Sequence, residues 1–163
     1  MLRPRFLLFN LGWFVALALM VGAASADTAA VQRYVTLRAA EVNLRAGPGE
    51  QFPIQWVYHR KGLPVEVIGK SDVWRKIRDW QGTEGWVHER MITGSRGAIV
   101  RGAVRPLHRD PDPASDVVAR AEPGVIAKLL ECRGAWCRVE ISDIKGWLGR
   151  NEIWGVDPDE DVR

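Results

Sequence analysis

The stretch LPVEVIGKSDVWRKIRDWQGTEGWVH, residues 63–88, decides the fold because short alternating apolar runs in it are separated by turn residues. An apolar side chain at every second position is typical of β-strands. The turn residues are Lys70-Ser71-Asp72 and Gln81-Gly82-Thr83. No segment after residue 26 keeps the spacing of an amphipathic helix for ten residues, so the sequence predicts an all-β protein. The predicted strands are residues 63–68, 73–80 and 85–88.

The same pattern occurs twice along the chain, at an interval of 61 or 62 residues. Two tandem units are therefore predicted, residues 34–94 and 98–156, joined at Ser95-Arg96-Gly97. Units of about 60 residues with several short strands indicate small, strongly bent β-barrels with marginal cores. Five markers carry the repeat: Gly62, Trp74, Gly85-Trp86, Ile92 and Gly94 recur as Gly124, Trp136, Gly146-Trp147, Ile153 and Gly155. The second set of strands is predicted at 125–130, 136–141 and 146–148.

The first 26 residues have the three parts of a secretory signal peptide. Arg3 and Arg5 precede an apolar stretch over residues 6–21, and Ala24-Ser25-Ala26 is a small-residue cleavage site before Asp27. We expect cleavage and a soluble product in the periplasm or outside the cell, without stable membrane insertion. An uncleaved anchor is the alternative, because the apolar stretch from Phe6 to Ala26 is about long enough to span a bilayer. No cysteine follows it, which argues against a lipid-modified N-terminus.

The charge of the chain gives no indication of a nucleic-acid partner. The formal net charge is +3, and removing residues 1–26 takes away two arginines and no acid, which leaves +1. A nucleic-acid-binding surface needs a concentrated excess of positive charge. Residues 157–163 form an acidic tail, which we interpret as a solvated chain end rather than a binding element.

A longer motif in the first unit resembles a known family. It begins with VNLRAGPG over residues 42–49 and continues through Phe52-Pro53, Gly62, Val65, Trp74 and Gly85-Trp86-Val87. This motif resembles the bacterial SH3-like domain. The segments LPVEV at residues 63–67 and WRKIR at residues 74–78 are similar to the tandem exported form found in alphaproteobacteria. The resemblance implies a five-stranded barrel with a long loop after the first strand and a 3₁₀ turn before the last. It also implies binding of peptides or cell-wall polymers without chemistry. In the second unit residues 106–113 replace the motif, which leaves binding there open.

The side chains of residues 73–80 divide between two faces of a strand. Ile77 matches the core position of Val139 in the other unit, which turns Trp74, Lys76, Arg78 and Trp80 outward. The resemblance places Trp74 at the groove tryptophan that packs on an extended ligand. It also places His88 and Met91 on the groove walls and Val87 and Ile92 in the core. The second unit keeps Trp136 but has Gly149 and Glu152 at the walls, so the first unit is predicted to be the better binder.

Trp56, Tyr58 and Trp80 have no aromatic counterpart in the second unit. We align Val118, Arg120 and Ile141 or a neighbour of Ile141 with them. A feature present in one copy is not required by the fold, so it belongs to a binding surface or to a contact between barrels. The alternative for Trp74 and Trp86 is that they cover the ends of a small barrel. Gly47, Pro48 and Gly49 are interpreted as turn formers, with glycine supplying positive φ. The candidate ligand-binding residues are Trp56, Tyr58, Trp74, Trp80, His88 and Met91.

Cys132 and Cys137 flank a short loop, and an oxidising compartment favours a disulfide between them. Strand parity is a difficulty, because Cys137 shares a face with Val139 whereas Cys132 shares one with Lys128. A β-bulge would reconcile the two faces. Two free thiols are the alternative.

A catalytic Cys-His pair is the enzymatic alternative, as in the cell-wall peptidases that carry bacterial SH3-like domains. We do not expect an enzyme, because His59, His88 and His108 lie within the barrel repeats, where surface positions are predicted, and no further domain remains to build a cleft. The two cysteines lack a histidine pair at ligand spacing, so we expect neither a metal site nor a cofactor. The sequence favours a non-catalytic envelope module for peptidoglycan or an extended peptide. A structural or assembly protein whose barrels pack on each other or on a partner is the alternative.

Overall fold

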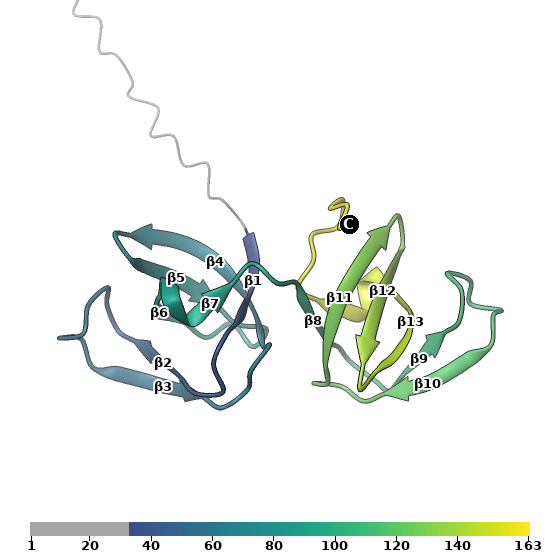
Figure 1. Cartoon of the computed structure of the whole chain (residues 1–163), viewed down its shortest axis with the longest axis horizontal. Coiled ribbons are helices and arrows are strands. Elements are labelled where there is room, and N and C mark those ends of the chain that lie inside the picture. The colour runs from purple at the N-terminus through teal and green to yellow at the C-terminus, as the bar shows by residue number, and fades with distance from the viewer. Residues whose placement is uncertain (1–32) are drawn as a thin grey trace, which may run out of the picture.

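The structure, a computed structural model, describes residues 33–163 as two antiparallel sheets that lie side by side (Figure 1). The predicted signal segment lies outside the described residues. The first sheet has the order β3-β2-β6-β5-β4-β1-β7 and the second the order β10-β9-β13-β12-β11-β8-β14. The prediction of an all-β tandem fold is confirmed. The first sheet contains β1 (Arg33–Leu37), β2 (Val42–Arg45), β3 (Ile54–Tyr58), β4 (Pro64–Ser71), β5 (Trp74–Arg78), β6 (Glu84–His88) and β7 (Ile92–Thr93). The second contains β8 (Gly97–Val100), β9 (Arg105–His108), β10 (Val117–Ala121), β11 (Ile126–Arg133), β12 (Trp136–Ile141), β13 (Ile144–Gly149) and β14 (Ile153–Trp154).

The two sheets have the same connectivity, and each is interrupted by a 3₁₀ turn before its last strand. These turns are η1 (Glu89–Met91) and η2 (Arg150–Glu152), as the family resemblance implied. Each sheet has seven strands rather than five. The two additional strands lie in the long loop expected after the first strand, where β2 pairs with β3 in the first barrel and β9 pairs with β10 in the second.

Each barrel encloses a small core of aliphatic side chains. Ile77 and Val87 are fully buried in the first barrel, and Val139 and Leu148 in the second. The strand parity predicted for Ile77 and Val139 is therefore correct. Ile92 packs against the first core from its edge.

The joint between the barrels is part of the first core. Ile99, on β8 of the second sheet, is fully buried in the first core cluster, and Ile126 on β11 packs against it. The Tyr34 and Trp154 rings meet edge to face with centroids 5.1 Å apart. Arg60 adds a hydrogen bond, in which Nη2 donates to the Gly124 carbonyl at 2.7 Å. The aromatic side chains that pack between the barrels are therefore Tyr34 and Trp154, and not Trp56 and Tyr58 of β3.

The disulfide predicted between Cys132 and Cys137 is present. The two residues are direct partners across β11 and β12, and the register shifts between Leu129 and Glu131. That bulge moves Cys132 onto the face of Cys137, which resolves the parity difficulty.

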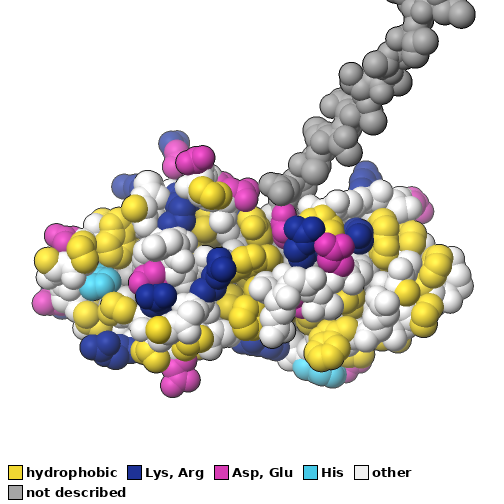
Figure 2. All heavy atoms as spheres, turned by 180° about the vertical axis from the view of Figure 1, so that it is seen from behind, with side chains coloured by type: hydrophobic (Ala, Val, Ile, Leu, Met, Phe, Trp, Pro, Cys, Tyr) yellow, Lys and Arg dark blue, Asp and Glu magenta, His cyan; other side chains and the backbone are white. Residues whose placement is uncertain are grey.

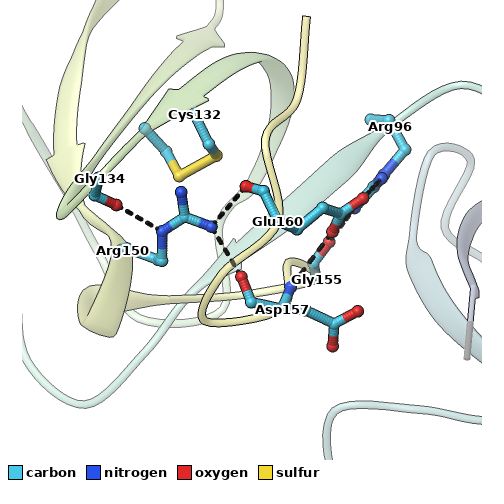
Figure 3. Close-up of a disulfide and its surroundings, with 8 residues drawn as sticks. Arg96, Cys132, Gly134, Arg150, Gly155, Asp157 and Glu160 are labelled. Carbon is cyan, nitrogen blue, oxygen red and sulfur yellow. Dashed lines mark hydrogen bonds and ion pairs between the residues drawn. A yellow bond between two sulfur atoms is a disulfide. The ribbon is translucent and has the colours of Figure 1, made fainter.

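The interpretation of residues 157–163 as a solvated end is wrong. Val162 is buried in the second core, and its carbonyl accepts a hydrogen bond from the Cys132 amide at 3.0 Å. Arg150 donates to the carbonyls of Asp157 and Glu160 at 2.7 and 2.8 Å and to Gly134 in the disulfide hairpin (Figure 3). The tail is therefore a fixed part of the second barrel. Within residues 33–163 no helix is long and apolar enough to cross a bilayer.

A candidate ligand groove beside Trp74

Trp74 lies opposite His88 across β5 and β6, on the sheet face opposite to that of Ile77. The two rings meet edge to face, with centroids 5.4 Å apart. Parity therefore placed Trp74 on the correct face. The expectation of an outward, exposed ring is wrong, because Trp74 is only 8% exposed.

A pocket of about 310 Å³ opens beside this ring pair. Three of the predicted ligand residues line it, namely Trp74, His88 and Met91. Their apolar surfaces are surrounded by a polar rim. An apolar floor with a few polar groups is the usual composition of a small-ligand site. The rim consists of Glu41, Asn43, Arg45, Glu50 and Arg90.

Arg45 holds the loop that closes one side of this pocket. Its Nη1 donates to the carbonyls of Glu50 and Phe52 at 3.0 and 2.8 Å. Gly47 belongs to this loop, but no positive φ is found there. Glycine is needed because a Cβ at Gly47 would lie 2.5 Å from the Phe52 ring. The loop glycine therefore permits close packing, and the expectation of positive φ at this turn is wrong.

His88 joins the pocket to the 3₁₀ turn η1. Its Nδ1 accepts a hydrogen bond from the Arg90 amide at 3.1 Å. Because Nδ1 is the acceptor, the proton of the neutral imidazole resides on Nε2. The Trp74–His88 pair therefore offers a ligand a hydrogen-bond donor beside an aromatic ring.

The structure does not gather all six predicted ligand residues on one surface. Trp56 is 57% exposed and Trp80 is 36% exposed, but neither lines the pocket. Tyr58 is buried in the core, where its hydroxyl donates to Asp79 Oδ2 at 3.0 Å, so its assignment to a ligand surface is wrong. Burial, together with the Asp79 carboxylate, raises the pKa of the Tyr58 phenol above its ordinary value.

Strand pairing also corrects the alignment of the two units. Leu44 pairs with Trp56, and its counterpart Leu107 pairs with Ala119. By the same register, Tyr58 corresponds to Ala121. Val118 and Arg120 are therefore the wrong counterparts, although the conclusion that the second unit has no aromatic residue at these positions holds.

The second barrel contains a tryptophan–histidine pair that the sequence analysis did not recognise. His108 on β9 meets Trp136 on β12 edge to face, with ring centroids 5.7 Å apart. His108 is 7% exposed, so its predicted surface position is wrong. A signal was present in the sequence. Leu107 and His108 occupy the positions of Leu44 and Arg45, where a core side chain is followed by a side chain that lines the pocket. His59, by contrast, has a largely exposed side chain.

Charges around the barrels are mixed rather than concentrated. Figure 2 shows basic and acidic side chains interspersed over one face. On the hairpin of β5 and β6, hydrogen bonds from Lys76 and Arg78 lower the pKa of the Glu84 carboxyl. In the described part of the chain, no cluster of three or more histidine, cysteine or acidic side chains is arranged to hold a metal ion.

The fold and the site together define the class of this protein. It consists of two small antiparallel barrels in tandem, and Trp74 lines a groove in the first of them. The family model of the bacterial SH3 domain matches the chain twice, over residues 38–94 and 102–155. These matches cover more than half of the chain, which therefore belongs to the bacterial SH3 domain family. Domains of this family are typically binding modules of the bacterial cell wall.

Comparison with curated protein sequences gives no match. Among solved structures, NlpC2 from Trichomonas vaginalis is 10% identical with a TM-score of 0.36, covering 77% of this chain and 48% of its own. NlpC1 from Trichomonas vaginalis is 10% identical with a TM-score of 0.35, covering 78% and 47%. An NlpC/P60 family protein from Bacillus cereus is 14% identical with a TM-score of 0.34, covering 80% and 58%. The chain thus spans about half the length of these proteins, and such scores carry no argument about activity.

Proposed function

We propose that this chain is a non-catalytic binding module of the cell envelope, in which the groove beside Trp74 takes an extended peptide or a peptidoglycan fragment. The observation that carries the proposal is the pocket itself. It combines the Trp74–His88 ring pair and Met91 with a polar rim, in a family whose domains typically bind the cell wall. A flat aromatic edge suits a ligand that is extended and contains apolar groups.

The chemistry of the rim supports a ligand that is polar along its backbone. His88 Nε2 donates, so it suits a carbonyl or carboxylate oxygen of the ligand. Arg45 is committed to the loop carbonyls and serves to hold the wall in place rather than to attract an anion. Glu50 and Arg90 have opposite charges on the same rim, which favours a ligand with both polar signs over a simple polyanion.

Export to the envelope belongs to the same proposal. We infer cleavage after Ala26, so that the mature chain begins at Asp27. The Cys132–Cys137 disulfide supports an oxidising compartment. Mass spectrometry of the chain recovered from the envelope fraction tests this, and an intact Met1 N-terminus in the membrane fraction would contradict it.

Retention on purified peptidoglycan tests the groove. We choose Met91→Glu, because Met91 lines the pocket yet is 38% exposed, so the substitution should leave the fold intact. It also installs the residue found at the equivalent position of the second barrel, Glu152. The expected result is a loss of about tenfold in affinity, or roughly 1.4 kcal/mol.

The matched control is Ile144→Glu, which places the same acid at another exposed apolar site, outside the pocket. It should bind like the unmodified chain. Equal retention of the unmodified chain and a folded Met91→Glu variant would remove the groove from the proposal. A parallel Trp74→Ala variant is informative only after its folding has been checked, since that ring is buried.

A structural or assembly role is the second candidate, and the edge strand β3 favours it. Ile54 and Trp56 are 47% and 57% exposed there, and the second barrel has no such pair. Sedimentation of the mature chain beside a Trp56→Ser variant distinguishes the two roles. Self-association lost on substitution, with no retention on peptidoglycan by either chain, would favour assembly.

A further inference from the structure

The 3₁₀ turns of the two barrels are capped in different ways. In the first barrel the side chain of His88 caps η1, because its Nδ1 accepts a hydrogen bond from the Arg90 amide at 3.1 Å. In the second barrel Gly149 stands at the same position and has no side chain to offer. The Gly149 amide donates there to the carboxylate of Glu152 at 2.9 Å. Of the two turns, η1 is therefore the one whose cap depends on an imidazole.

An imidazole cap differs from the usual N-cap side chains because its acceptor can be lost. Serine, threonine, aspartate and asparagine keep an acceptor oxygen. Nδ1 of a neutral imidazole accepts, but in the protonated ring both nitrogens are donors. A protonated His88 therefore presents an N–H to the N–H of Arg90, and the hydrogen bond is lost. Imidazoles change charge between about pH 5 and 8, which is the range in which this cap is sensitive to protons.

The turn η1 is otherwise held at its two ends by backbone hydrogen bonds, which do not titrate. The Glu89 amide donates to a carbonyl of the β4–β5 connection, and the Met91 carbonyl accepts from the Arg38 amide, both at 2.8 Å. Arg90 lies between these two attached residues, and its amide donates to the His88 ring. Loss of the cap therefore loosens the middle of the turn and leaves its ends in place.

The middle of the turn is also a wall of the candidate groove. Arg90 and Met91 line the pocket together with His88 and Trp74. Nε2 of His88 is a donor in both charge states of the ring, so protonation leaves intact the hydrogen bond that this atom can offer to a ligand. What protonation changes is the cap, and through it the wall of the groove.

Charged side chains of both signs share this pocket with His88. Those that line it are Glu41, Glu50, Arg45 and Arg90. A further pair, Arg75 of β5 and Glu89 of η1, is joined by an ion pair. The rim thus has two charges of each sign, and the hydrogen bond to Arg90 is the contact that distinguishes the neutral from the protonated ring.

We propose that His88 is a proton-controlled cap, whose protonation loosens η1 and lowers the affinity of the groove beside Trp74. This control presupposes the binding function proposed for that groove. Proton uptake and ligand binding then oppose each other, so the groove holds its ligand at neutral pH and releases it as the pH falls through the range in which imidazoles titrate. The second barrel has no such control at η2, where Gly149 replaces the histidine.

The Arg90 amide signal tests the cap without any ligand. Its chemical shift and hydrogen-exchange rate are followed in the ¹⁵N-labelled mature chain between about pH 5 and 8, together with the ring C–H signals of the three histidines. We expect the Arg90 signal to follow the titration of the His88 ring. Relative to the intrinsic rate at each pH, its exchange should be about threefold faster in acid, since one exposed hydrogen bond is lost. An Arg90 signal that does not follow His88 would overturn the cap.

Retention on purified peptidoglycan tests the effect on binding. His88→Asn keeps an acceptor for the Arg90 amide, because asparagine is among the preferred N-cap residues, but it does not titrate near neutral pH. The matched control is His59→Asn, which removes the exposed histidine that lies 3.7 Å from the rim residue Glu41. The unmodified chain and His59→Asn should bind about threefold more weakly at about pH 5.5 than at about pH 8, whereas His88→Asn should show little of this change. All chains meet the same polymer, so its own titration affects them equally.

Two results would overturn the control of binding by His88. They are a pH dependence of His88→Asn equal to that of the unmodified chain, and loss of the pH dependence in His59→Asn. No retention of any chain at about pH 8 would instead contradict the function proposed for the groove, and the Arg90 signal would still decide on the cap. Should His88→Asn alone fail to fold, the Arg90 signal of the unmodified chain decides, because a cap that does not titrate cannot control the groove.

Discussion

The two barrels share one sheet order but are closed by different chemistry, beyond the end of β5 in the first and at the start of β12 in the second. In the first barrel, Tyr58 on β3 donates to the buried carboxylate of Asp79, which also accepts from the amides of Gln81 and Thr83 at 2.9 Å. In the second barrel, the residues at the positions of Tyr58 and Asp79 are Ala121 and Ile141.

The turn between the two central strands changes together with that pair. Where the first barrel has a loop over residues 79–83, the second has the two-residue turn Ser142-Asp143, with φ of 47° and 68°. Positive φ at both residues is the geometry of a tight hairpin turn. The second barrel has its disulfide and its C-terminal tail instead. A repeat therefore preserves the glycines and tryptophans of the sheet, whereas each copy acquires its own means of closing.

The largest expected effect concerns the repeat tryptophans. Trp74→Ala should lower the free energy of unfolding by about 3 kcal/mol, because a nearly buried ring is lost. Trp136→Ala should cost less, since Trp136 is only partly buried. Urea unfolding followed by circular dichroism measures both. If Trp136→Ala lost more free energy of unfolding than Trp74→Ala, the expected order of the two variants would be contradicted.

The next effect sharpens the difference in closure. Asp79→Ala should cost about 2–3 kcal/mol, because it removes three hydrogen bonds to a carboxylate and leaves the Tyr58 hydroxyl buried without a partner. Tyr58→Phe is the matched control and should cost less, since it removes one bond and leaves Asp79 its two amides. Equal losses for the two variants would show that the loop amides contribute nothing.

The strands, the repeat, the disulfide and part of the candidate site could be predicted from the sequence. Strands, repeat and disulfide follow from local patterns, and the bulge at Leu129 and Glu131 was required by the parity of the two cysteines. Of the candidate site, the parity of Trp74 and the grouping of Trp74, His88 and Met91 were correct.

What escaped prediction depends on contacts distant in sequence. Alternation assigns Trp74 to a face but does not say what covers that face. Tyr58 is buried because its hydroxyl finds Asp79, 21 residues away. The acidic tail is fixed because Arg96 and Arg150 meet it, and no local pattern of charges indicates such partners.

The disulfide gives a smaller effect, confined to the second barrel. Replacing both Cys132 and Cys137 by serine should cost no more than about 2 kcal/mol, because the closed loop is short. Hydrogen exchange should accelerate first in β11, β12 and the tail, since the Cys132 amide bonds to Val162. Uniform acceleration over both barrels would indicate instead that they unfold as one unit through the shared Ile99.

The smallest expected effect on stability comes from the ion pair of Arg96 and Glu160, which links the C-terminal tail to the joint between the barrels. Arg96 precedes β8, and its Nη2 donates to Glu160 Oε2 at 2.9 Å and to the Gly155 carbonyl at 2.9 Å. The hydrogen bond from Arg96 is the largest cause of a lowered Glu160 pKa, opposed by partial burial and aided by the Asp157 amide. The Arg96 guanidinium also lies over the Tyr34 ring, at 5.9 Å from its centroid. Burial and the nearby carboxylates, among them Glu160, raise the pKa of Tyr34 to about 12.

The sign of the pH dependence follows from that lowered pKa. A carboxyl that is more acidic in the folded chain than in the unfolded one binds fewer protons when folded, so it stabilises the fold above its unfolded pKa of about 4.3. The stabilisation is lost as the pH falls through the folded value. The unmodified chain should therefore exceed Glu160→Gln by about 1 kcal/mol or less at neutral pH, and the gap should close below about pH 4. Asp159→Asn removes a charge from the same tail without touching Arg96, so it should show a smaller gap. Urea unfolding between about pH 3 and 7 measures both, and a Glu160→Gln gap that widens in acid would contradict the assignment.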